Sequence, residues 1–136
     1  MDEPMARIQV LMDLDDQESR QIRNGIQEVT ERTDQSEEDL GNAVQAFAQV
    51  GYGVDEIVGW LLPATAIYSD RWGEHPEELA HQVATVMKVY SVPPRKAERF
   101  LKYINRFLIS RGVIHADALN LLERMAPILL SGDHDE

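Results

Sequence analysis

The chain of 136 residues contains no cysteine. Without cysteine there is no disulfide framework, no thiolate nucleophile and no cysteine-ligated metal cluster. Long apolar runs are also missing, since the run over residues 59–68 is far shorter than the roughly 20 residues that span a bilayer. Residues 1–16 carry acids on both sides of a short apolar run, which is the wrong charge order for a secretory signal. We therefore expect a cytoplasmic protein that makes no membrane contact.

The motifs of common enzyme classes are absent from the sequence as well. No GxSxG elbow, P-loop, dinucleotide-binding GxGxxG or HExxH pattern occurs. Carboxylate pairs fall in the first turns of expected helices, where the positive end of the helix dipole explains them. We expect no catalytic site, no cofactor and no small-molecule substrate.

Glu78 and His81 form a pattern that resembles part of a metal site. Their spacing of three residues places both on one helix face and matches half of the Glu-x-x-His motif of carboxylate-bridged di-iron bundles. Such a site needs a second motif and further inward glutamates, and one chain does not contain them. A dimer could supply the second motif from its other copy. We predict no metal site and keep these two residues as weak candidate ligands.

Apolar residues follow a 3.6-residue period in every long segment, and no alternating apolar runs are joined by a hairpin turn. The sequence therefore predicts an all-α fold, a compact single-domain bundle of five to seven helices built from antiparallel helical hairpins. A chain of this length suits one core. The domain is expected over residues 1–131, with residues 1–14 ambiguous between helix and strand and a disordered tail at 132–136.

Capping residues mark several helix ends. Asp15 and Glu18 form a capping box, and Ser36 is expected to cap a helix that Gly51 stops. Asp55 is the expected cap of the next helix. Later helices are expected over residues 76–90, 94–112 and 116–130.

Pro63 interrupts the apolar pattern that Ile57, Trp60 and Leu61 begin. A proline inside a helix lacks a donor and crowds the carbonyl four residues earlier, at Gly59. We therefore expect a kink or a new helix near Pro63.

A weak internal echo appears at an offset of 39 residues. Leu40, Val44, Phe47 and Val50 correspond in this way to Leu79, Val83, Val86 and Val89. Two copies are too few to establish a solenoid, and any antiparallel helix pair gives similar spacing. We interpret the echo as ordinary hairpin spacing.

Positive charge is scarce and concentrated. Acids number 24 against 13 lysines and arginines, giving a net charge of -11, which repels nucleic acid at long range. Residues 88–111 nevertheless hold seven of the thirteen cations and one acid, Glu98. At 100° per residue the basic side chains fall on one helix face, opposite an apolar face that runs from Ala97 to Leu108 and includes Phe107. The predicted binding surface is Arg95, Lys96, Arg99, Lys102, Tyr103, Arg106 and Arg111.

Two aromatic residues are candidate interface anchors. Tyr68 and Trp72 fall in a segment expected to connect helices, where core burial is less assured, and a tryptophan beside an arginine is common at interfaces. The alternative is a tryptophan that folds back over the end of the bundle.

Three functional hypotheses follow from these features. The first is a non-enzymatic accessory or regulatory subunit that contacts a protein partner or its own copies, for example by docking the basic helix on the acidic residues 13–39. The second is a nucleic-acid-binding subunit that uses the basic helix, with Tyr103 stacking on an unpaired base. The third is an acidic inhibitor that imitates nucleic acid.

Overall fold

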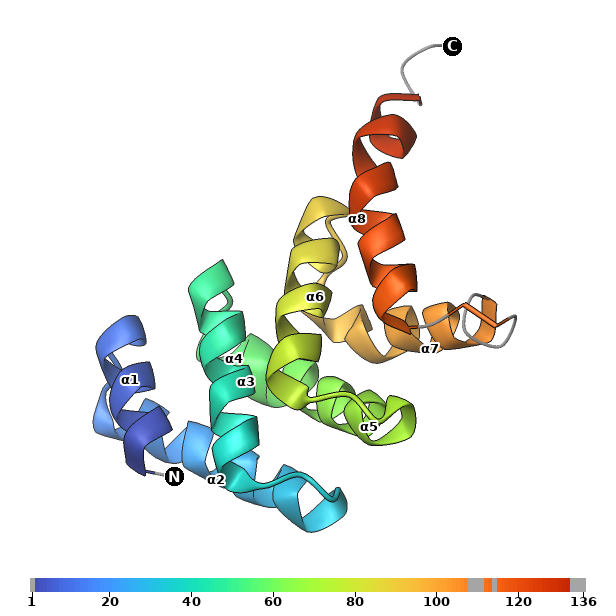
Figure 1. The fold of residues 1–136 in the computed structure, drawn as a ribbon. Helices are drawn as coiled ribbons and strands as arrows, with labels where there is room; N and C mark the ends of the chain where they lie inside the picture. The colour runs from blue at the N-terminus through green and yellow to red at the C-terminus, as the bar shows by residue number, and fades with distance from the viewer. Residues whose placement is uncertain (1, 108–111, 114, 133–136) are drawn as a thin grey trace.

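The computed structural model describes residues 2–107, 112–113 and 115–132, and the secondary-structure elements in this part of the chain are all helices, with no strand (Figure 1). The predicted all-α bundle of five to seven helices is confirmed, because the elements of the described residues join into seven rods. Two of these rods are composite, since α4, η1 and α5 are continuous and η2 leads into α7. The elements are α1 (Asp2–Met12), α2 (Asp16–Arg32), α3 (Glu37–Val50), α4 (Val54–Glu56), the π-helical turn η1 (Ile57–Leu61), α5 (Leu62–Trp72), α6 (Pro76–Val89), the 3₁₀ turn η2 (Pro94–Lys96), α7 (Ala97–Phe107) and α8 (His115–Gly132).

The rods form two layers that run in different directions (Figure 1). Helices α1, α3, α6 and α8 stand side by side and all run from bottom to top in that view, whereas α2, α5 and α7 run across them. The most extensive helix packing joins α3 to α6, followed by α1 to α3 and α6 to α8. Helices that lie side by side in the first layer therefore pack against each other more extensively than consecutive helices joined by a short turn do.

The offset of 39 residues has a structural basis. Helices α3 (Glu37–Val50) and α6 (Pro76–Val89) begin and end at this offset, and they are the neighbours with the most extensive contact. Leu40, Val44 and Phe47 are buried, as are their counterparts Leu79, Val83 and Val86. The echo thus corresponds to two helices that lie side by side in one layer and run in the same direction, each the second helix of a consecutive pair, α2 with α3 and α5 with α6.

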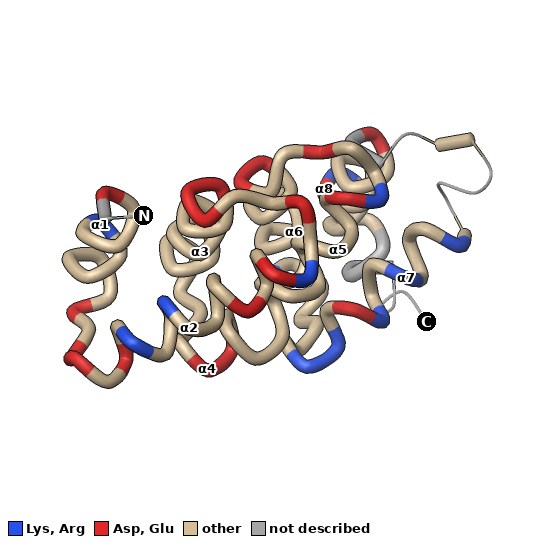
Figure 2. Tube along the Cα trace, turned by 90° about the horizontal axis from the view of Figure 1, so that it is seen from below, with Lys and Arg blue, Asp and Glu red and all other residues tan. Residues whose placement is uncertain are grey.

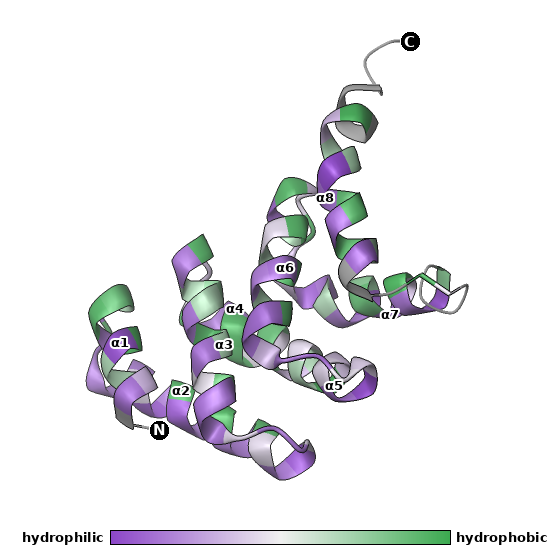
Figure 3. Ribbon diagram, in the orientation of Figure 1, coloured by the Kyte–Doolittle hydropathy of each residue, from purple (hydrophilic) through white to green (hydrophobic). Residues whose placement is uncertain are grey.

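The ambiguous N-terminal segment is a helix. Met5 and Ile8 of α1 are almost completely buried against the rest of the core. Figure 3 shows hydrophobic and hydrophilic residues alternating around the helices, as expected where each helix buries one face. Helix α8 ends at Gly132, and the tail predicted after it lies outside the described residues. None of the helices in the described ranges is both long and apolar enough to cross a membrane.

The predicted caps of α2 and α3 are confirmed. Asp15 accepts the N–H of Glu18 at 2.7 Å, and the Glu18 carboxylate accepts the N–H of Asp15 at 3.2 Å. Ser36 accepts the N–H of Asp39 at 3.1 Å. Gly51 ends α3 with φ of 105°, a left-handed conformation that glycine adopts without steric penalty.

The cap predicted at Asp55 was wrong by two residues. Helix α4 begins at Val54, after Gly53, and the Glu56 carboxylate accepts the N–H of Gly53 at 2.8 Å. Asp55 lies in the first turn and accepts a hydrogen bond from the Gln21 amide of α2 at 2.6 Å. The acid therefore ties two helices together instead of capping one.

Pro63 does not break its helix. The π-helical turn η1 lies immediately before it, and the N–H of Leu62 bonds the carbonyl of Ile57, five residues back. Pro63 is the second residue of α5, so a new helical segment does begin near Pro63 as expected, and it does so without interrupting the continuous rod. The wider π-helical turn accommodates the proline, which has no N–H to donate. Ile57, Leu61 and Leu62 are all buried on one side of the wider turn. Trp60 is 52% exposed, so the expectation that it belongs to the core face was wrong.

Helix α2 approaches η1 closely at a glycine. A Cβ atom placed on Gly25 would lie 2.6 Å from Cγ1 of Val58, which is shorter than any ordinary contact. Gly25 is buried, and both segments belong to the second layer. The absence of a side chain at position 25 therefore sets how closely the two helices pack.

Candidate functional site

Helix α7 packs against the core through its apolar face. Ala97, Leu101 and Ile104 are buried, and the helix packs against α5, α8 and the turn η1. The Nε1–H of Trp72 in α5 donates a 2.9 Å hydrogen bond to Oδ1 of Asn105 in α7. The predicted amphipathic arrangement is therefore present, and the opposite face of α7 is exposed.

The exposed face carries the predicted cations. Arg95, Lys96, Arg99, Lys102 and Arg106 are all exposed, and Figure 2 shows basic positions in blue along α7 and the turn before it. Arg111 lies outside the described residues. We call Arg95, Lys96, Arg99, Lys102, Tyr103, Arg106 and Phe107 the α7 surface.

Three of these cations have no acidic partner in the described part of the chain. No ion pair joins Lys96, Arg99 or Lys102 to a carboxylate there, whereas Arg7 pairs with Glu3 and Arg32 with Glu28 on other helices. Like charges spaced by four residues oppose helix formation by a few tenths of a kcal/mol per pair. The buried face of α7 holds the helix in place against this repulsion.

Tyr103 and Phe107 form an exposed aromatic pair. Their ring centroids are 4.5 Å apart with an interplanar angle of 38°, and the residues are 60% and 40% exposed. We expected Phe107 in the core, and that expectation was wrong because its spacing of four residues places it beside Tyr103. This same spacing is the sequence signal that would have found the pair.

Two shallow hollows flank Tyr103. One has a volume of about 230 Å³ and is lined by Arg99, Lys102, Tyr103, Arg106 and Phe107. The other has a volume of about 220 Å³ and is lined by Val92, Lys96, Arg99, Phe100 and Tyr103. Arg99 and Tyr103 line both, so these two side chains form a ridge between a strongly basic hollow and a more apolar one.

Tyr68 and Trp72 do not lie in a connection between helices. Both belong to α5, where Tyr68 is buried and Trp72 half-buried, with ring centroids 5.1 Å apart. Burial raises the pKa of Tyr68, Arg71 opposes this shift, and Glu98 adds to it. The prediction of a connection between helices was wrong because α5 extends to Trp72. The tryptophan folds back toward α7, in line with the alternative given for it.

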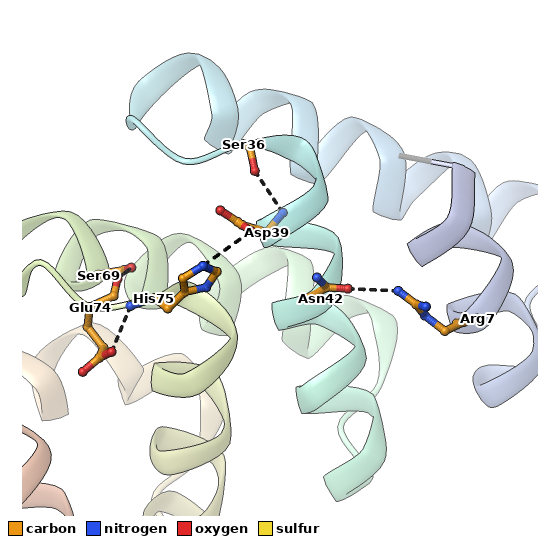
Figure 4. A network of polar contacts seen from close by, with 7 residues as sticks. All are labelled: Arg7, Ser36, Asp39, Asn42, Ser69, Glu74 and His75. Atoms are coloured by element: carbon orange, nitrogen blue, oxygen red, sulfur yellow. Dashed lines mark hydrogen bonds and ion pairs between the residues drawn. The ribbon is translucent and has the colours of Figure 1, made fainter.

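Glu78 and His81 both lie on α6, as predicted, and both are exposed. Within the described residues no three histidine or acidic side chains gather as a metal ion would require. Nε2 of the nearby His75 lies 3.8 Å from Oδ1 of Asp39 in α3 (Figure 4). The N–H of Asp39 donates the capping hydrogen bond to Ser36. These contacts, with the hydrogen bond from Arg7 to Asn42 at 3.2 Å, join neighbouring helices of the first layer.

An acidic hollow of about 490 Å³ lies where α2 and α4 begin. Its carboxylates include Asp15, Glu18, Asp55 and Glu56, and each accepts a hydrogen bond from a backbone N–H or a glutamine amide. Helix capping accounts for Asp15, Glu18 and Glu56, and the hydrogen bond from Gln21 accounts for Asp55, so the hollow does not require a ligand to explain it.

Comparison of this chain with known protein families, curated proteins and solved structures finds no match. Within the described residues, the α7 surface brings together positive charge, exposed aromatic rings and surface hollows.

Proposed function

We propose that this chain is a non-enzymatic binding module that docks on an anionic macromolecule through the α7 surface. The observation that carries the proposal is the exposed cluster of Lys96, Arg99 and Lys102, which have no acidic partner in the described part of the chain. Such a module suits a small accessory subunit of a larger assembly.

The packing of α7 supports the proposal. Buried Leu101 and Ile104 and the hydrogen bond between Trp72 and Asn105 hold the helix against the rest of the molecule without any ligand. A preorganised surface binds more tightly because less conformational entropy is lost on association. Basic side chains along a fixed helix also steer an anionic partner toward the surface during encounter.

The excess of acidic residues in the chain limits how much of a polyanion the protein can contact. With a net charge of -11, the rest of the chain repels an extended polyanion, so contact is confined to α7 and its flanks. We therefore expect binding that weakens steeply as salt rises, because screening and counterion release both reduce the attraction.

Heparin is a suitable first probe because it is densely anionic and carries no bases. We expect fluorescein-labelled heparin to bind at low salt and to be released at high salt, as measured by fluorescence anisotropy. The double variant Arg99→Glu/Lys102→Glu should lose this binding.

The matched control is Arg20→Glu/Arg124→Glu, which makes the same change in net charge at exposed positions on α2 and α8. Circular dichroism should show unchanged helicity in both double variants, because all four side chains are exposed. The proposal fails if the two variants bind heparin equally, or if wild-type protein does not bind it at low salt.

A further inference from the structure

Resting on the proposed function, the geometry of the α7 surface points to single-stranded nucleic acid as its ligand, and we infer that Tyr103 and Phe107 stack on its unpaired bases. The features that carry the inference are the exposed aromatic pair, the hollows on both sides of Tyr103 and the cations that line them.

The exposed aromatic pair offers a surface on which bases can stack. Tyr103 and Phe107 expose 60% and 40% of their surface, although both lie on a helix whose other face offers burial. A base has a flat apolar face that covers such rings, and stacking of this kind does not depend on sequence. The rings therefore supply affinity that charge alone does not.

The cations stand where a phosphate backbone would pass. Arg99 and Lys102 line the hollow next to both rings, and Lys96 and Arg99 line the hollow on the other side of Tyr103. A base in either hollow would keep its neighbouring phosphates within reach of a basic side chain. Arg99, which lines both hollows, would contact the backbone between two successive bases.

The same geometry disfavours the other anionic ligands. Carboxylates of an acidic peptide would use the cations but have no π face to cover Tyr103 and Phe107. The bases of a duplex are covered by their neighbours in the stack, so that only splayed-out bases of a single strand reach aromatic rings. The surface thus fits a single strand better than a duplex or an acidic protein.

The footprint is short. From Arg95 to Arg106 the helix rises by about 17 Å, at about 1.5 Å per residue. The rest of the chain is net acidic, so nucleotides beyond this stretch meet net repulsion. If four phosphates are neutralised, log affinity for a single strand should fall against log salt with a slope of about -3.

The experiment compares a labelled oligothymidine of about 12 nucleotides, which falls within the usual site sizes, with a duplex of equal length and with heparin. We expect the oligothymidine to bind more tightly than the duplex at equal salt. The diagnostic variant is Tyr103→Leu, which removes the ring and keeps a helix-forming apolar residue at an exposed position.

Tyr103→Leu should weaken oligothymidine binding about tenfold, because loss of one base-stacking ring has an effect of this order. Heparin binding should stay unchanged, since heparin has no base to stack. Arg99→Glu/Lys102→Glu should abolish binding of both probes, and Arg20→Glu/Arg124→Glu should affect neither.

The inference is overturned if Tyr103→Leu binds oligothymidine as well as the wild type does, or if the duplex binds as tightly as the single strand. Binding of heparin that still requires Arg99 and Lys102 would then leave the proposed function standing. Light scattering adds a separate test, because a dimer that forms at low salt and is lost in Arg99→Glu/Lys102→Glu would make a second copy the occupant. Failure of every anionic probe would remove the proposed function as well.

Discussion

Replacing Gly25 with alanine tests the close approach of α2 to η1. Alanine is favoured over glycine inside a helix by about 1 kcal/mol, so propensity alone predicts stabilisation. The new Cβ would, however, lie 2.6 Å from Cγ1 and 3.3 Å from Cγ2 of Val58, and a β-branched side chain has few rotamers with which to move away. Geometry therefore predicts that Gly25→Ala lowers the free energy of unfolding, whereas helix propensity predicts that it raises it.

The size of the effect follows from these two contributions. Overpacking a well-filled contact costs about 1–3 kcal/mol, which exceeds the gain in propensity and leaves a net loss of about 1 kcal/mol. With Val58→Ala in place, the nearest remaining atom is the Cβ at 3.4 Å, an ordinary contact. Gly25→Ala should then stabilise by about 1 kcal/mol, so the coupling between the two sites is about 2 kcal/mol.

Urea and thermal unfolding followed by circular dichroism measure these changes, and 1 kcal/mol corresponds to about 4 °C in Tm for a chain of this size. The control is Gly59→Ala, because a Cβ there meets nothing within 4 Å and should stabilise by about 0.5–1 kcal/mol. If Gly25→Ala raises Tm as Gly59→Ala does, helix propensity decides the outcome and the close approach is not a constraint.

Three further predictions concern Tyr52 and Ser91, which follow the ends of α3 and α6. The Tyr52 hydroxyl is buried with no hydrogen-bond partner among the described residues, so Tyr52→Phe should raise the unfolding free energy by about 1 kcal/mol; an unchanged or lower value argues against this. Burial, and less strongly Glu56, raises the pKa of Tyr52, so wild-type stability should fall above about pH 10, where the unfolded chain ionises first, and Tyr52→Phe should lose less. Ser91 has φ of 55°, so Ser91→Gly should raise Tm by an amount equivalent to about 0.5–1 kcal/mol, and a lower Tm would contradict the strain.

The helix boundaries were largely predictable from the sequence because capping is local chemistry. Asp15, Ser36 and Gly51 act within a few residues of their own positions, and the structure confirms all three. The error at Asp55 has a long-range cause, since its carboxylate is drawn to Gln21, 34 residues away in the chain. A partner so distant leaves no signal in the local pattern.

The candidate site was predicted in part. Periodicity placed Arg99, Lys102 and Tyr103 on one exposed face, because side-chain direction around a helix depends on spacing. The same periodicity assigned Phe107 to the opposite, apolar face, and that assignment failed because the packing of α7 leaves Phe107 exposed beside Tyr103.

The sequence by itself determined the helical content, most helix ends and the segregation of positive charge onto α7, since each depends on residues within one or two turns. Tertiary structure decided which helices became neighbours, and this turned the offset of 39 residues into the contact between α3 and α6. It also buried Tyr68 and exposed Trp60, because burial depends on what packs opposite a side chain and on the π-helical turn that rotates one helix against the others.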